Sequence, residues 1–368
     1  MKTMANEKRK DVALVLSSGG ARGLAHIGAI EELEANGYRI CSIAGCSMGA
    51  LVGGVYAAGK LNEFREWMKT IDRKKMLGLT DFSLSLSHLV KGTRIIEAIM
   101  EFVPDVAIED LPIPYCAVAT DLKAGKEVVF KKGSLFEAIR ASISLPSFYE
   151  PVRRDDMILI DGGVINPIPL NRVYRHGGDI LVGVDVSGHD YKAQWEEMRR
   201  LADIQKKDTS WKARILDRLM PDNIDFNYYT VLSRTSSIMI RQNSILMTKL
   251  MDPDMLVDIQ MNRYGTFDFD KSEKIIAIGR HKTALAISKY EQNCTYTFLC
   301  VVNLIFPAIT IVFLKPKEVV FGFGLAFVVG FFGIAEQAPK AIHTASEDHG
   351  IFFRNDIVEL DDIGIEVN

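Results

Sequence analysis

The sequence predicts an α/β protein whose strands are buried on both faces, followed by a C-terminal two-helix membrane hairpin. Short apolar runs alternate with helical stretches from residue 11 to about 185, a pattern typical of α/β sheets. The chain then becomes helical and charged until about residue 290, after which two long segments carry no charge. Hydrophobic residues make up 48% of the 368 positions, enough for one large core and a smaller appendage.

The individual elements follow from these patterns. Five apolar runs are expected to form buried strands: 12–16, 40–44, 115–119, 157–160 and 180–186. Five stretches are expected to form helices: 24–36, 48–59, 62–71, 93–102 and 134–142. Farther along, Met and Leu are spaced for one apolar helix face at Ile238, Ile245, Met247, Leu250 and Met251. We interpret this Met-rich face as adaptable core, because methionine fills irregular gaps, and not as a lipid site.

The two ends of the chain differ in charge. Residues 1–10 form a basic tail, and the apolar run that follows is too short for a signal peptide. We therefore interpret that run as the first strand of a domain spanning 11–290 and expect this domain to stay in the cytoplasm. Residues 336–368 form an acidic tail that is expected to be solvated and to carry no chemistry.

The hairpin is predicted between residues 294 and 335. Residues 295–314 and 319–335 are uncharged, and roughly twenty apolar residues suffice to cross a bilayer. Because neither run is amphipathic, two buried core helices are the weaker interpretation. Small residues at Gly322, Ala326 and Gly330 allow a helix to approach closely, within the hairpin or in a homodimer. The basic residues that flank the hairpin favour an orientation with both of its ends on the cytoplasmic side, whereas the lysines of the connector oppose this orientation. A re-entrant hairpin therefore also stays open. We expect a bacterial inner or plasma membrane.

Composition excludes several classes of function. A net charge of −3 and a pI near 6.2 argue against a nucleic-acid partner, which usually selects a basic surface. The five cysteines show neither metal-ligand spacing nor a disulfide framework, which indicates a reduced compartment. No cluster of histidines and carboxylates has ligand spacing either, so we expect neither a metal nor a cofactor.

A candidate nucleophile lies in the pentapeptide Gly45-Cys46-Ser47-Met48-Gly49, which follows a predicted strand and opens a helix. In this context G-x-S-x-G is a nucleophile elbow, a sharp turn that projects the serine Oγ above the sheet. Gly45 and Gly49 let neighbouring backbone pass close, and the helix N-terminus adds positive charge where an oxyanion forms. The pattern makes Ser47 the candidate nucleophile.

A glycine-rich loop, residues 17–23, lies between the first strand and the next helix. Its consecutive backbone N–H groups can cradle an anion. A dinucleotide fingerprint fits poorly because position 18 is serine, and a P-loop is excluded because no Gly-Lys-Ser/Thr follows. An oxyanion hole for acyl transfer fits best, and its residues are Gly19, Gly20, Ala21, Arg22 and Gly23. Arg22 either pairs with a carboxylate under the loop or contacts substrate.

A candidate partner for the serine is Asp161, which follows the apolar strand at 157–160 and precedes Gly162 and Gly163. Taken alone, an Asp-Gly pair is most often a turn. Beside an elbow and an anion cradle, a carboxylate at a strand end is better explained as a partner of the nucleophile.

These three motifs, in this order, resemble the patatin-like phospholipases. So do the stretches Arg140–Pro146 and Tyr264–Asp270, and the resemblance covers residues 11–288. It implies a three-layer α/β/α fold with a mostly parallel central sheet, a catalytic dyad of Ser47 and Asp161, and an oxyanion hole at residues 19–23. The family's usual first loop glycine is Ser18 here, which could alter the geometry of the oxyanion hole.

The resemblance implies a serine acyl hydrolase acting on membrane-lipid esters, of the phospholipase or lysophospholipase A type. The substrate is expected to be a phospholipid, a lysophospholipid or an acylglycerol, presented by the bilayer. A Ser–His–Asp triad is the nearest rival, but no histidine lies in a motif that requires it, and His26 is better explained as structural. The second hypothesis is a membrane-bound lipid-binding or scaffold protein with a relict fold.

Overall fold

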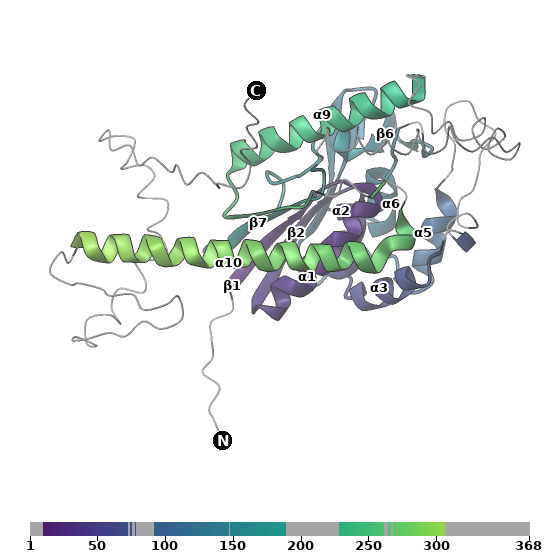
Figure 1. Ribbon diagram of the computed structural model, residues 1–368. Helices are drawn as coiled ribbons and strands as arrows, with labels where there is room; N and C mark the ends of the chain where they lie inside the picture. Colours follow the sequence, from purple (N-terminus) through teal and green to yellow (C-terminus); the bar gives the residue numbers. More distant parts are fainter. Residues whose placement is uncertain are drawn as a thin grey trace, which may run out of the picture. The chain divides into compact units, whose positions relative to one another are not determined.

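The computed structural model describes residues 10–72, 74–75, 78, 92–146, 148–188, 228–260, 264–265 and 268–305 (Figure 1). The chain divides into a large unit, Met1–Ser288, and a second unit, Lys289–Asn368. The large unit contains the sheet and every candidate site residue.

The sheet contains each strand that the apolar runs predict, together with three more. The predicted strands are β1 (Lys10–Leu16), β2 (Tyr38–Cys46), β3 (Tyr115–Asp121), β6 (Met157–Asp161) and β7 (Ile180–Asp185). The additional strands are β4 (Lys126–Phe130), β5 (Val152–Arg154) and β8 (Met255–Asp258). They are short, and β4 and β5 are only partly buried, so they lack the long apolar runs that reveal buried strands.

The sheet is mixed, with four parallel and three antiparallel pairings among the described strands, so the expectation of a mostly parallel sheet is confirmed only in part. The strand order is β5-β6-β3-β2-β1-β7-β8, and β4 also pairs with β3. The pairings of β1 with β2 and β7, of β2 with β3 and of β7 with β8 are parallel. Those of β3 with β4 and β6, and of β5 with β6, are antiparallel. One side of the sheet therefore reverses direction at β3.

The helices also follow the sequence pattern. The predicted ones are α1 (Ala25–Ala35), α2 (Met48–Ala57), α3 (Leu61–Lys69), α5 (Thr93–Met100) and α6 (Leu135–Ser142). Two longer helices follow, α9 (Tyr228–Met251) and α10 (Ser272–Ile305). Short 3₁₀ turns are η1 (Gly20–Leu24), η2 (Ile108–Asp110), η3 (Gly162–Val164) and η4 (Phe269–Lys271).

Helices cover both faces of the sheet, as the alternating directions of the side chains along β1 show. Ala13 and Val15 belong to a buried cluster against which α9 packs through Met247 and Met251. Leu16 faces the other way, toward α2, where a Cβ on Gly53 would lie 3.3 Å from its Cδ1. Because neighbouring strand residues point to opposite faces, α9 and α2 lie on opposite sides of the sheet (Figure 1). The large unit is therefore a helix–sheet–helix sandwich.

Two further contacts shape the helical layers. A Cβ on Gly28 of α1 would lie 2.0 Å from the carbonyl oxygen of Ile276 in α10. A Cβ on Gly279 of α10 would likewise lie 2.0 Å from the carbonyl oxygen of Ala25 in α1. The absence of side chains at both glycines lets these helices touch through their backbones. On α9, by contrast, the single apolar face predicted from the sequence is wrong in part, because the Leu250 side chain is 77% exposed.

The predicted membrane hairpin gains no support from the structure. Its expected start at residue 294 lies inside α10, which already begins in the charged segment at Ser272. Among the described residues, no helix combines the length and apolarity needed to cross a membrane. Residues 306–335 of the hairpin, the acidic tail 336–368 and the basic residues 1–9 lie outside the described part of the chain.

Candidate active site

Ser47 lies on the sharp turn between β2 and α2. Its backbone has φ 53° and ψ −122°, a left-handed conformation that is unfavourable for a residue with a Cβ. The glycines on either side are required by close backbone contacts. A Cβ on Gly49 would lie 2.2 Å from the Leu16 carbonyl oxygen, and one on Gly45 would lie 2.5 Å from the Gly49 oxygen. The structure therefore gives the G-x-S-x-G segment the geometry of a nucleophile elbow.

Asp161 meets Ser47 because of the register of β3. β3 pairs with β2 up to Val118, opposite Cys46, and with β6 from Ala119, which lies opposite Asp161. The end of β6 thus adjoins the end of β2. The Ser47 Oγ donates a hydrogen bond to Asp161 Oδ2 at 2.5 Å. The other carboxylate oxygen, Oδ1, accepts the Gly163 backbone N–H at 2.7 Å.

Burial tunes the basicity of this carboxylate. Asp161 is 4% exposed, and burial raises its pKa from 3.8 to about 6. The hydrogen bonds from Ser47, Gly163 and the Cys46 thiol oppose this rise, because they stabilise the charged form. The carboxylate is thus a stronger base than an exposed aspartate, yet it is still ionised at neutral pH.

A second buried serine, Ser142 at the end of α6, holds the Ser47 backbone in place. Its Oγ accepts the Ser47 backbone N–H at 2.8 Å and donates to the Val118 carbonyl oxygen at 2.7 Å. Ser142 is fully buried. It therefore ties the strained turn to β3, the strand that also sets the position of Asp161. The only indication in the sequence that Ser142 belongs to the site was its place in the Arg140–Pro146 stretch.

We expect Ser142→Ala to lower kcat by about 30-fold while leaving KM nearly unchanged, because the buried Ser47 amide loses its acceptor. Steady-state kinetics on a soluble ester would measure this. Hydrogen exchange at the Ser47 amide, accelerated only if that bond is lost, separates positioning from general destabilisation. An unchanged kcat would show that the turn does not need Ser142.

The glycine-rich loop lies beside the dyad as η1. Because this short helix begins at Gly20, its first N–H groups have no acceptor within the helix. Gly20 has φ 57°, and a Cβ on Gly19 would lie 2.3 Å from Val186 Cγ2. The Arg22 Nε donates to the Gly19 carbonyl oxygen at 3.1 Å, so this side chain braces the loop from within. A Cβ on Gly23 would collide with the Met48 side chain at 2.3 Å.

Ser18, where the resembling family has glycine, lies against the turn that follows Asp161. Its backbone N–H donates to the Pro167 carbonyl oxygen at 2.8 Å. Its Oγ lies beside the Asp161 turn, 3.0 Å from the position that a Cβ on Gly163 would take. A Cβ on Gly162 would be blocked by the Val118 carbonyl oxygen at 2.3 Å. Both glycines after Asp161 are therefore needed for this close approach.

A cavity of about 190 Å³ opens over the dyad and contains Ser47, Asp161 and part of the glycine-rich loop. Apolar side chains form much of its wall, namely Leu51, Ile95, Ile96, Ile99, Ile143, Leu145, Pro146, Phe148 and Tyr149. A larger cavity of about 360 Å³ lies near Arg153 but contains neither member of the dyad. We assign chemistry to the smaller cavity because it contains the hydrogen-bonded pair of a buried hydroxyl and a buried carboxylate, Ser47 and Asp161, together with residues of the glycine-rich loop.

The histidines that the structure describes, His26, His176 and His281, do not line this cavity. His26 is fully buried in α1, and its ring Nε2 lies 2.8 Å from the Ser17 carbonyl oxygen. Burial lowers its pKa to about 4, so the ring is neutral at pH 7 and donates to that carbonyl. The described histidines thus offer no third member for a triad.

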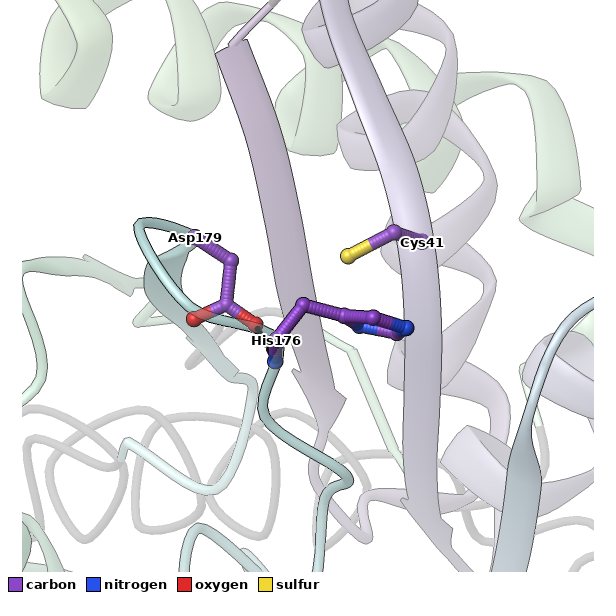
Figure 2. A group of neighbouring side chains, drawn as sticks. All are labelled: Cys41, His176 and Asp179. Carbon is purple, nitrogen blue, oxygen red and sulfur yellow. Dashed lines mark hydrogen bonds between the residues drawn. The ribbon is translucent and has the colours of Figure 1, made fainter.

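The structure also brings together Cys41, His176 and Asp179, a group that sequence spacing did not reveal (Figure 2). Their possible ligand atoms lie within 4.8 Å of one another, at the end of the sheet where β7 begins. The Asp179 carboxylate already accepts hydrogen bonds from Arg175 Nε and the His176 backbone N–H, each at 2.6 Å. These contacts account for the buried charge, and the group is remote from the elbow at the end of β2.

Comparisons with known proteins show to which families the chain is similar in sequence. Residues 14–174 match the family model described as Patatin-like phospholipase, a shorter stretch than the resemblance over 11–288. An uncharacterized NTE family protein of Mycobacterium bovis is 48% identical over 179 residues, 49% of this chain and 50% of that protein. Neuropathy target esterase sws of Drosophila melanogaster is 32% identical over 186 residues, 49% of this chain and 13% of its own.

A further relative is patatin-like phospholipase domain-containing protein 6 of Mus musculus, 33% identical over 186 residues. These residues are 49% of this chain and 14% of the mouse protein. The chain thus spans half the length of the mycobacterial relative and far less of the animal ones. Residues 14–174, which include Ser47 and Asp161, thus match the patatin-like phospholipase family model, and about half of the chain is similar in sequence to NTE family proteins.

Proposed function

We propose that this protein is a serine acyl hydrolase that cleaves carboxylic esters of lipids through a Ser47–Asp161 dyad. The observation that carries the proposal is the 2.5 Å hydrogen bond from Ser47 Oγ to Asp161 Oδ2, at the floor of a largely apolar cavity. The family match over residues 14–174 supports the same class of reaction.

In the proposed reaction, Ser47 Oγ attacks the acyl carbonyl carbon while its proton passes to Asp161. The carbonyl oxygen becomes negatively charged and is held by backbone N–H groups of Gly19, Gly20 and Ala21. As the intermediate collapses, the ester bond breaks and Asp161 returns the proton to the departing alcohol. Water then attacks the acyl-enzyme, again with Asp161 as base, and releases the fatty acid.

The walls of the cavity favour an amphiphilic substrate. Isoleucines of α5 and the segment after α6 offer an apolar surface to an acyl chain, and burial of each methylene contributes about 0.8 kcal/mol. Phospholipids, lysophospholipids and acylglycerols all present such a chain next to an ester. Attachment to the bilayer through residues 294–335, and a homodimer through that hairpin, stay predictions from the sequence that no described residue supports.

A fluorophosphonate probe tests the proposal directly, because it reacts only with a serine whose hydroxyl is activated. We expect one covalent adduct, located at Ser47 by peptide mass spectrometry, and complete loss of ester turnover in the labelled protein. Pretreatment with a saturated fatty acyl ester should slow the labelling. An unlabelled Ser47 in folded protein would instead support the alternative of a lipid-binding protein with a relict fold.

A further inference from the structure

Ser187 carries a buried hydroxyl with no partner among the residues that the structure describes. The residue is 3% exposed and follows the end of β7. An unpaired buried hydroxyl costs about 1–3 kcal/mol, so its presence calls for an explanation. Ser187 also lines the cavity that holds Ser47 and Asp161.

The backbone around Ser187 is fixed on two sides. The Val186 N–H donates to Ser17 Oγ at 2.9 Å, which attaches this segment to the start of the glycine-rich loop. The Ser187 N–H donates to Asp185 Oδ1 at 2.8 Å. Asp185 in turn accepts hydrogen bonds from Arg241, at 2.9 Å, and from Ser244, and so anchors α9 beside Ser187.

This anchoring divides the cavity by polarity. From α9 the cavity is lined by Ser236, Ser237 and Ile240, so three of its lining hydroxyl groups belong to Ser187 and to the helix that Asp185 anchors. The wall made by α5 and the segment after α6 is almost wholly apolar. An ester bound at Ser47 would therefore place its acyl chain against the apolar wall and its alcohol part near the hydroxyl groups.

We propose that Ser187, with Ser236 and Ser237 of α9, forms a subsite that binds the glycerol unit of the ester's alcohol part by hydrogen bonds. A hydroxyl can both donate and accept, which matches the free hydroxyl and ester oxygens of glycerol. The inference rests on the proposed function and adds to it the side of the cavity on which the alcohol lies. Selectivity then arises because a simple alkyl alcohol leaves the Ser187 hydroxyl unpaired.

Esters that share an octanoyl chain test this subsite, namely octanoylglycerol, octanoyl glycerophosphocholine and ethyl octanoate. For Ser187→Ala we expect kcat/KM on octanoylglycerol to fall about tenfold, and turnover of ethyl octanoate to stay within about twofold. A similar fall on the phosphocholine ester locates the contact at the glycerol unit, as proposed. A fall confined to the phosphocholine ester would assign Ser187 to the phosphate and overturn the glycerol assignment.

Thr120→Val is the matched control, because Thr120 Oγ1 is likewise buried and unpaired among the described residues but does not line the cavity. This variant should leave the ratio of the three rates unchanged. Equal losses on all three esters for Ser187→Ala, or no loss on octanoylglycerol, would overturn the subsite. A wild-type protein that neither turns over ethyl octanoate nor reacts with the fluorophosphonate would instead refute the dyad, and the subsite with it.

Discussion

Replacing Asp161 by Asn is expected to lower kcat for a soluble ester about 10³-fold, because the amide cannot accept the Ser47 proton. The side chain keeps its shape, so the turn at Gly162 and Gly163 should survive. In the unchanged protein, kcat should rise as pH increases through about 6, where the buried carboxylate loses its proton, and should level off above. Steady-state rates between pH 4 and 8 would measure both effects.

The same carboxylate links stability to pH with the opposite sign. Its pKa is about 6 when folded and near its ordinary 3.8 when unfolded, so between these values the folded state binds more protons. The free energy of unfolding should therefore fall as pH rises from about 4 to about 6, by an amount on the order of 3 kcal/mol. Asp161→Asn should lack this decrease, as denaturant titrations at several pH values would show.

Two outcomes would contradict this role for Asp161. A kcat that is constant from pH 4 to 8 would mean that no group with a pKa near 6 must lose a proton for catalysis. An Asn variant with nearly full activity would show that another residue takes the serine proton. Asp179→Asn is a suitable control, because Asp179 is also a buried aspartate but lies at the other end of the sheet.

Replacing Ser47 by Gly is expected to abolish hydrolysis and, at the same time, to raise stability relative to Ser47→Ala. Loss of the nucleophile should reduce kcat on the order of 10⁵-fold in both variants. Both also leave Asp161 Oδ2 without the Ser47 hydroxyl. They differ in that alanine keeps a Cβ at φ 53°, whereas glycine adopts this conformation without strain.

We expect the glycine variant to unfold with a free energy about 1 kcal/mol higher than the alanine variant, as measured by chemical denaturation. The comparison isolates backbone strain at the nucleophile from the loss of its hydroxyl. Equal stabilities would indicate that the elbow is unstrained. Turnover well above this expected residual level in either variant, after removal of contaminating esterases, would show that Ser47 is not the nucleophile.

The sequence by itself determined the local parts of this protein. Apolar runs revealed the buried strands, because burial on both faces leaves a continuous hydrophobic signal. The elbow at Ser47 and the loop at Gly19–Gly23 were readable because glycine and serine at fixed spacing encode a local backbone shape. The short strands β4, β5 and β8 were not predicted from the sequence, because β4 and β5 are only partly buried and none of the three carries a long apolar run.

Only the tertiary structure decided which distant residues meet. Asp161 lies beside Ser47 because β3 changes partner from β2 to β6 between Val118 and Ala119, a matter of register that no local pattern encodes. Ser142 and Ser187 are chemically ordinary serines in the sequence. Burial and a neighbouring cavity give them distinct roles, because the cost of an unpaired polar group depends on what surrounds it after folding.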